Sequence, residues 1–228
     1  FNIMSMPFLF DSKENFYNAI DGDFGDRMAE IGKQAGFKIF GYSDSGTRHM
    51  ANSKREITCL NDVKGLKIRI PEVDITIAFM NALGCSPTPI SFSETYTALQ
   101  QGVVDGMENP IELLYTCKFM ETMDYLTLTG HSETSLAFIM NADAFAKLTS
   151  EQQKIITDGA AEQFKANREA IAASEDTYLQ NMIKEGKAIT ELTDEAKQEF
   201  KNAVIPVYEK YSSIIGQDLI DLAKSYNK

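Results

Sequence analysis

The chain has 228 residues, of which 43% are hydrophobic and 24% are charged, and its formal net charge is −11. This composition is typical of a soluble globular protein, long enough for one larger domain or for two small lobes with real cores. The acidic balance argues against nucleic acid as a partner, because neutralising phosphates requires clustered lysine and arginine.

The front of the chain is apolar, but no basic segment followed by an apolar one marks it as an export signal. No apolar run is long enough to span a bilayer. The chain opens on Phe1 in FNIMSMPFLF, a stretch that looks like the interior of a domain. We therefore expect the N-terminal part of a first lobe to be missing.

Residues 11–35 are predicted to be helical, because apolar side chains recur at spacings of three and four between Tyr17 and Met28. Gly22 and Gly25 predict a break of this helix into two pieces.

Two strands are predicted next, with a polar segment between them. Residues 37–42 (FKIFGY) form the first and residues 65–71 (GLKIRIP) the second. The intervening stretch 43–54 (SDSGTRHMANSK) is polar and contains glycine, so it is predicted to be a loop or a crossing segment.

Arg69 stands in the middle of the second strand. Alternation places Leu66, Ile68 and Ile70 on one face and Lys67 and Arg69 on the other. A fixed cation in a buried setting needs a partner, because an unpaired buried charge is costly. Since no nearby residue in the sequence is clearly placed to pair with it, the pattern favours an anion from outside the chain.

Two helices are predicted to follow this strand. The first has Pro71 in its first turn and ends at Gly84. The second carries Ser91 and Glu94 at the spacing of a capping box and ends at Gly102.

Residues 103–107 (VVDGM) are predicted to be a short buried strand. Asn109 then caps a helix that has Pro110 at its first position. Residues 126–131 (LTLTGH) and 136–141 (LAFIMN) are predicted to be two further strands.

A long helix is predicted over residues 149–185, with Thr149 and Gln152 as its capping box. At 1.5 Å per residue it would be roughly 50 Å long, which exceeds one small lobe, so it should bridge two. A short strand near 188–192 (AITEL) and helices over 194–228 complete the prediction.

Strands that alternate with helices predict an α/β fold with parallel strands and right-handed crossovers. The bridging helix predicts two lobes that close over a ligand by a hinge. We expect residues 1–45 to be the remaining part of lobe 1 and residues 46–134 to be lobe 2. Residues 135–175 return to lobe 1 and enter the bridging helix, and residues 176–228 hold its end, a short strand and the C-terminal helices.

A resemblance to a known family is carried mainly by residues 64–110, with KGLKIRIP followed by ALGCSPTPISFSETYTALQQGVVDGMENP. KFMETMDYLTLTGH continues it, and MPFLF, SGTRHMANSKREI and LTSEQQKII extend it over essentially the whole chain. The chain resembles the solute-binding proteins of tripartite ATP-independent periplasmic (TRAP) transporters. This implies a two-lobed periplasmic or extracytoplasmic protein that hands an organic acid to a membrane permease driven by an ion gradient.

The resemblance also implies site residues. Arg69 would pair with the ligand carboxylate, Arg48 would assist, Phe92 would line the pocket and Asn109 would hydrogen-bond the carboxylate. Each has an alternative role: a structural salt bridge for Arg69, loop or hinge structure for Arg48, a helix cap for Asn109 and a helix staple for Phe92.

Glu72 follows the RIP motif where some sialic-acid-binding relatives have asparagine. A carboxylate there would accept hydrogen bonds from ligand hydroxyls and repel a second ligand carboxylate. This favours a sugar acid such as a hexuronate over a C4-dicarboxylate, although Glu72 also suits the first turn of a helix.

No motif indicates catalysis, a metal or a cofactor: the sequence has no P-loop, GxGxxG or GxSxG, and its two histidines show no metal or acid–base spacing. We expect a monomeric binding protein that is not an enzyme. Two alternative hypotheses are a ligand-sensing module of a signalling system and an enzyme that acts on a carboxylic acid.

Overall fold

The computed structural model describes residues 2–227. Its strands are β1 (Phe37–Asn52), β2 (Lys67–Ile70), β3 (Ser86–Pro89), β4 (Gly106–Pro110), β5 (Tyr125–Asn141) and β6 (Ala188–Glu191). Its helices are α1 (Lys13–Ile20), α2 (Asp23–Gln34), α3 (Asp74–Ala82), α4 (Phe92–Gln100), α5 (Ile111–Thr116), α6 (Ala142–Ala146), α7 (Ser150–Lys184), α8 (Asp194–Ala203), α9 (Ile205–Ile215) and α10 (Gln217–Lys224). Short 3₁₀ turns lie at Asn2–Ser5, Leu60–Val63 and Phe119–Thr122.

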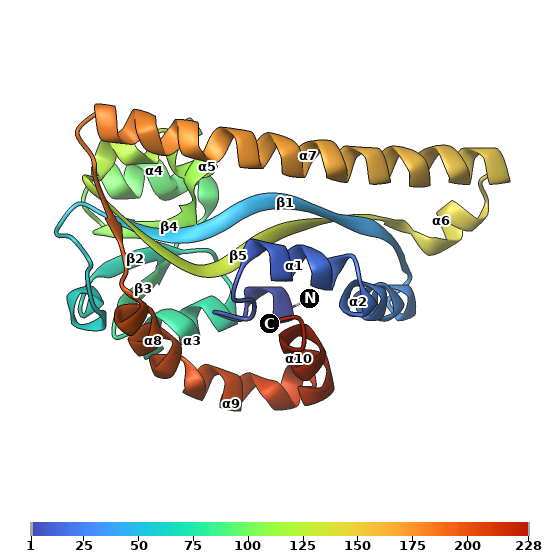
Figure 1. Cartoon of the computed structure of the whole chain (residues 1–228), viewed down its shortest axis with the longest axis horizontal. Coiled ribbons are helices and arrows are strands. Elements are labelled where there is room, and N and C mark those ends of the chain that lie inside the picture. Colours follow the sequence, from blue (N-terminus) through green and yellow to red (C-terminus); the bar gives the residue numbers. More distant parts are fainter. Residues whose placement is uncertain (1, 228) are drawn as a thin grey trace.

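The strands form one sheet with the order β3-β2-β4-β1-β5-β6. The pairs β2–β3, β2–β4 and β5–β6 are parallel, whereas β1 runs antiparallel to both β4 and β5. The predicted α/β class is confirmed, but the sheet is mixed rather than parallel throughout. The long strands β1 and β5 run side by side along most of the molecule (Figure 1).

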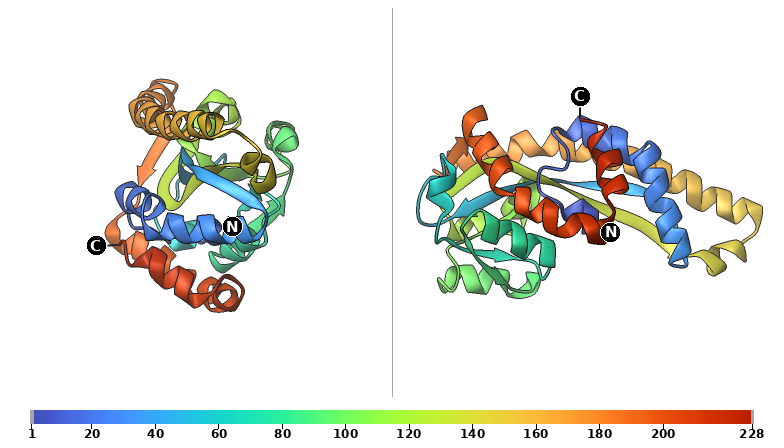
Figure 2. Two further views of the ribbon diagram at one scale, coloured as in Figure 1. Left: turned by 90° about the vertical axis from the view of Figure 1, so that its right-hand side faces the viewer. Right: turned by 90° about the horizontal axis from the view of Figure 1, so that it is seen from below.

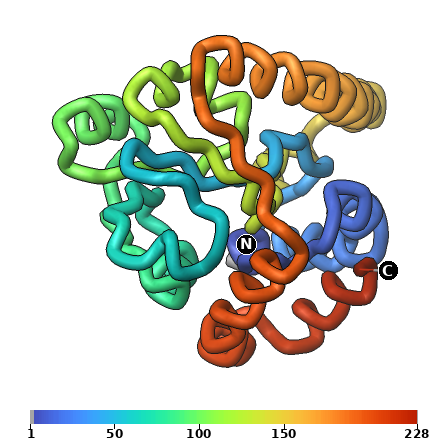
Figure 3. The backbone as a smooth tube through the Cα atoms, turned by 60° about the vertical axis from the view of Figure 1, so that its left-hand side comes forward, coloured from blue at the N-terminus to red at the C-terminus, as the bar shows by residue number. Residues whose placement is uncertain are grey.

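Helices cover both faces of the sheet. The helix α7 lies along one face, while α1, α2 and α8–α10 lie on the other (Figures 1 and 2). One buried cluster joins β2 to α1–α3 and α8–α10, and a second joins β4 and β5 to α4, α5 and the C-terminal part of α7. After α7 the chain passes through β6 to reach α8, a path that Figure 3 follows.

Two predictions about strands are wrong in a related way. The segment predicted as a loop at 43–54 is strand as far as Asn52, and the two strands predicted at 126–131 and 136–141 are one continuous strand, β5. The polar residues of these segments find hydrogen-bond partners on neighbouring elements, so the chain can stay extended. The pairing of β1 with β5 shifts register at three places, which bends the ribbon without ending it.

Gly46 lies at one of these shifts, between Asp44 and Thr47. Its φ of +94° belongs to the region that glycine adopts most readily, and an added Cβ would lie 3.0 Å from Cβ of Pro110. The glycine therefore lets β1 turn past the end of β4.

Three local predictions near the strand ends are also corrected. Helix α3 begins at Asp74, so Pro71 precedes it, and Pro110 rather than Asn109 stands at the start of α5. Asn109 pairs as part of strand β4 instead. Ser91 does precede α4, but its hydroxyl donates to the Glu94 carboxylate at 2.5 Å and does not cap a backbone amide.

The long helix is confirmed almost residue for residue, with the predicted capping box of Thr149 and Gln152. The predicted break is confirmed at Gly22, which separates α1 from α2, but not at Gly25, which lies inside α2. No helix within residues 2–227 combines the length and apolar character needed to cross a membrane.

Candidate functional site

The carboxyl ends of β2, β3 and β4 lie at one edge of the sheet, because these three strands run parallel. In open α/β sheets the crevice outside such ends is the usual place for a ligand. Arg69, Ile90, Phe92 and Asn109 all lie at or next to these ends. We call this group the strand-end cluster.

Arg69 is a buried cation, 3% exposed. Its Nε and Nη2 donate to the carbonyl oxygen of Ile90 at 2.9 and 2.7 Å, and its guanidinium lies 5.9 Å from the centre of the Phe92 ring. No carboxylate of residues 2–227 forms an ion pair with it. Burial lowers the pKa of Arg69 from its ordinary value, and the nearby Glu108 charge opposes this.

Asn109 presents a second donor without an acceptor. Its side chain is buried, and its Nδ2 makes no hydrogen bond with any described residue. Phe92 opens the helix α4, is 49% exposed and packs edge-on against Phe119 with ring centres 5.5 Å apart. The cluster therefore combines a buried positive charge, a free amide donor and a partly exposed aromatic ring.

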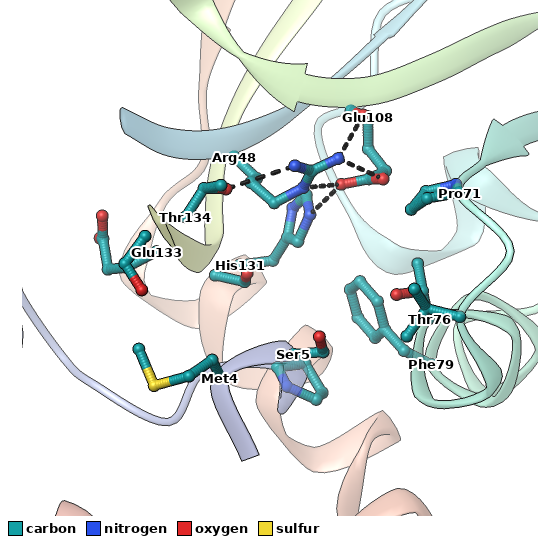
Figure 4. A pocket seen from close by; sticks show the side chains of 14 residues that line it. Met4, Ser5, Arg48, Pro71, Thr76, Phe79, Glu108, His131, Glu133 and Thr134 are labelled. Atoms are coloured by element: carbon teal, nitrogen blue, oxygen red, sulfur yellow. Dashed lines mark hydrogen bonds and ion pairs between the residues drawn. The ribbon is translucent and has the colours of Figure 1, made fainter. Parts of the chain in front are cut away.

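A cavity of ≈ 130 Å³ is lined by residues next to the cluster in the chain, including Pro71, which follows β2, and Glu108, which precedes Asn109 in β4. Figure 4 shows Arg48 and Glu108 on one side of this cavity, with Thr76 and Phe79 from α3 on another. Glu133 lies on a third side. We call this the Glu108 cavity.

The partly buried Arg48 and the fully buried Glu108 form an ion pair in this cavity. Nε and Nη2 of Arg48 donate to the two carboxylate oxygens, the second at 2.7 Å, and Nη2 also donates to the Glu108 carbonyl at 3.0 Å. Nη1 donates to the hydroxyl of Thr134 at 3.3 Å. Burial alone would raise the pKa of Glu108, but Arg48 and His131 outweigh it and hold the pKa at about 2.

His131 completes this group from β5. Its Nε2 lies 3.2 Å from a Glu108 oxygen and its Nδ1 lies 2.7 Å from the hydroxyl of Thr129. Burial lowers the pKa of His131, although Glu108 opposes the effect. A neutral ring that donates from Nε2 to Glu108 and accepts at Nδ1 from Thr129 satisfies both contacts.

The structure brings three of the five predicted residues together, namely Arg69, Phe92 and Asn109. Arg48 lies in the Glu108 cavity and is already paired. Glu72 is exposed just before α3 and does not line the Glu108 cavity.

Sequence reasoning missed Glu108, His131 and Glu133 as parts of the site. Glu108 stands within the quoted ENP turn, so that motif held a signal for it. His131 and Glu133 gave none, because only the pairing of β1 with β5 brings them to the cavity.

Comparisons with known proteins agree with this architecture. The family model described as "Bacterial extracellular solute-binding protein, family 7" matches residues 1–214. A solute-binding protein of Verminephrobacter eiseniae is 34% identical over 223 residues, which are 98% of this chain and 66% of that protein. The chain thus spans slightly less than two thirds of this relative's length.

Two solved structures of TRAP periplasmic solute-binding proteins are similar in fold. The one from Sulfitobacter sp. NAS-14.1, with bound β-D-galacturonate, has a TM-score of 0.92 and 30% identity, and the match covers 98% of this chain and 74% of that one. The one from Sulfurospirillum deleyianum, with bound succinate, has a TM-score of 0.90 and 30% identity, covering 99% and 74%.

Proposed function

Because this chain belongs to the bacterial extracellular solute-binding protein family 7, the solute-binding proteins of TRAP transporters, we propose that it captures a sugar acid and delivers it to a TRAP membrane permease. Members of this family are extracytoplasmic binding proteins that serve transport and are not enzymes. We propose the same periplasmic or extracytoplasmic location, and a monomer, for this protein.

The observation that carries the proposal is the combination of an unmatched charge on Arg69 and an unpaired amide donor on Asn109 in the strand-end cluster. A guanidinium offers a planar fork that fits a carboxylate through two parallel hydrogen bonds. Arg69 is buried without a carboxylate partner in residues 2–227, and Asn109 lies nearby at the end of the neighbouring strand with its Nδ2 unpaired. A ligand carboxylate would balance the charge of Arg69 and accept a hydrogen bond from Asn109.

The other predicted residues take supporting roles in the proposal. Phe92 forms an aromatic wall beside the bound carboxylate, and Arg48 presents a wall whose charge Glu108 already balances. Glu72, exposed beside Pro71, would contact ligand hydroxyls at the mouth of the site.

The ligand class follows from the polarity of the two parts of the site. A hexuronate places one carboxylate at Arg69 and leaves a set of hydroxyls for the polar lining of the Glu108 cavity, which includes Ser132 and Thr134. The galacturonate complex of the Sulfitobacter protein supports this class. The succinate complex of the Sulfurospirillum protein makes a C4-dicarboxylate the alternative ligand.

Hinge closure completes the proposed mechanism. The boundaries proposed at residues 45/46, 134/135 and 175/176 fall inside β1, β5 and α7, so three continuous elements would connect the lobes. A ligand that contacts both lobes stabilises the closed form by its differential affinity for it.

The proposal is tested by isothermal titration calorimetry of D-galacturonate and succinate against the purified chain and its Arg69→Ala variant. Wild-type protein should bind at least one of these acids. Arg69→Ala should weaken that binding by about 2–5 kcal/mol, because the ligand charge loses its partner. Arg27→Ala is the matched control, since Arg27 is an exposed arginine of α2 whose one ion pair within residues 2–227 is with Glu30. Equal affinity of wild type and Arg69→Ala would refute the proposed site.

A ligand-sensing module remains the second candidate, because it would bind the same acids without a permease. Transport of labelled acid by membrane vesicles that contain the permease, with and without this protein, separates the two functions.

A further inference from the structure

One carboxyl group of the Glu108 cavity has no cation to pair with. Arg48 and Glu108 balance each other's charge in direct contact, and burial lowers the pKa of His131. Glu133, which lines the same cavity from β5, forms no ion pair with any residue of 2–227. Its carboxyl group therefore sets the charge of the lining (Figure 4).

Glu133 is held by a single hydrogen bond. The hydroxyl of Thr47 donates to its Oε2 at 2.8 Å, and the two residues lie opposite each other in the β1–β5 pairing. The other oxygen, Oε1, makes no hydrogen bond with the described part of the chain. One oxygen thus orients the side chain, and the other remains available to a ligand.

The surroundings of Glu133 are rich in acids. The ammonium group of Lys13 already serves two carboxylates, Glu175 at 3.1 Å and Asp44 at 3.6 Å. Burial raises the pKa of Glu133 to about 7, with Asp44 and Glu175 adding to the rise and Thr47 and Lys13 opposing it. Near neutral pH this carboxyl group is therefore part protonated and part ionised.

We propose that Glu133 determines the specificity of the Glu108 cavity by pairing its free Oε1 with a ligand hydroxyl and by disfavouring a second ligand carboxylate at that position. The favoured ligand is a hydroxylated monocarboxylate, and C4-dicarboxylates are discriminated against. This inference rests on the proposed function, because Arg69 has to hold the first carboxylate of the ligand.

The hydrogen-bonding capacity of the groups explains the discrimination. A hydroxyl donates and accepts, so it pairs with Glu133 whether or not the side chain carries a proton. A carboxylate only accepts, so it pairs with the protonated form and is repelled by the ionised form.

This difference predicts a pH dependence between pH 6 and 8. The charged and titratable groups around Glu133 are Arg48, Glu108 and His131 in the cavity and Lys13, Asp44 and Glu175 beside it. The pKa of Glu108, about 2, lies well below this range, and burial lowers the pKa of His131. As Glu133 loses its proton, succinate should bind more weakly, and galacturonate should change less.

The test is calorimetry of D-galacturonate and succinate against wild type, Glu133→Gln and Glu175→Gln. Wild type should prefer galacturonate. Glu133→Gln should reduce the galacturonate-to-succinate affinity ratio about tenfold or more. Glu175→Gln is the matched control, because it removes one charge from the same acidic group but does not line the cavity. Because Glu175 helps to raise the pKa of Glu133, its removal should leave the ratio unchanged or raise it, but should not lower it.

The pH series on wild type keeps the test decisive even where Glu133→Gln fails to fold. The affinity ratio should rise from pH 6 to pH 8, and a flat ratio would overturn the inference. An unchanged ratio in Glu133→Gln, an equal fall in Glu175→Gln, or a wild-type preference for succinate would overturn it too. If both acids bind to wild type and Arg69→Ala abolishes the binding of both, the proposed function stands even when the inference about Glu133 fails. If wild type binds neither acid, or Arg69→Ala binds as well as wild type, both ideas fail.

Discussion

Two arginines on neighbouring parts of one sheet, the buried Arg69 and the partly buried Arg48, have opposite surroundings. Arg48 on β1 faces the Glu108 carboxylate, with a hydrogen bond to each of its oxygens. Arg69 on β2 donates to the Ile90 carbonyl and lies beside the Phe92 ring, two neutral groups, and it forms no ion pair within residues 2–227. The charge of one arginine is balanced within the protein, and the charge of the other is not.

This difference separates an arginine that stabilises the fold from an arginine whose charge is left for a ligand to balance. A buried pair is complete by itself, so its removal affects folding first. A buried cation that is held by neutral dipoles keeps its orientation but has no counter-charge. A ligand carboxylate can supply that charge, so removal of the cation should affect binding first. The same substitution at both arginines should therefore give opposite results.

The largest effect on stability is expected for Arg48→Met. The substitution leaves the Glu108 carboxylate buried without its cation, which should destabilise the fold by about 3–5 kcal/mol. Urea denaturation measures this loss. The double variant Arg48→Met/Glu108→Gln removes the orphaned charge and should recover most of the stability. No recovery would mean that packing, rather than the charge, dominates at this position.

Arg69→Met should behave in the opposite way. Binding should weaken by about 2–5 kcal/mol in calorimetry, while the urea midpoint should stay near that of wild type. The reason is that removing an unpaired buried cation relieves a desolvation penalty, which offsets the two lost hydrogen bonds to Ile90. A large fall in stability with unchanged affinity would reverse the roles assigned to the two arginines.

The paired arginine should also be visible in the acid stability of the protein. The pKa of Glu108 is about 2 in the folded state, against an ordinary value of 4.5. The unfolded chain therefore takes up a proton first as the pH falls below 4.5, so the stability from this group is present above pH 4.5 and is lost towards pH 2. The slope is about 1.4 kcal/mol per pH unit for one proton.

Denaturation curves recorded across this range should show that slope in wild type. Glu108→Gln should reduce it, because the group that titrates is gone. The pKa of the buried His131 is also lowered, so this residue contributes a separate loss of stability as the pH falls below about 6.5. His131 is present in both proteins. Identical acid profiles for the two proteins would show that the pair does not titrate as described.

Sequence reasoning reached the strand that carries Arg69 and the long helix α7 because their signals are local. The alternation of Ile68, Arg69 and Ile70 and the capping box at Thr149 lie within a few residues of what they predict. The unmatched charge of Arg69 followed from the same local reading, because no acid nearby in the sequence was placed to meet it.

The Glu108 cavity could not be predicted from such local signals. The partners Thr47 and Glu133 are 86 residues apart, and Arg48 and Glu108 are 60 apart, so a polar stretch that looks like a loop is satisfied only by pairing in the folded sheet. The same cause misassigned residues 43–52. Asn109 has the chemistry of a helix cap, but pairing of β4 with β1 holds it in a strand.

The smallest effect is expected for Phe92, the neutral neighbour that distinguishes Arg69 from Arg48. Phe92→Leu keeps an apolar side chain but removes the ring face at 5.9 Å from the guanidinium, which should weaken ligand binding by about 0.5–1 kcal/mol. Phe92→Tyr retains the ring and should bind like wild type in the same titration. Because Phe92 is 49% exposed, neither change should move the urea midpoint appreciably. A loss of affinity in the tyrosine variant equal to that in the leucine variant would show that Phe92 acts through its shape, and that the Ile90 carbonyl alone orients Arg69.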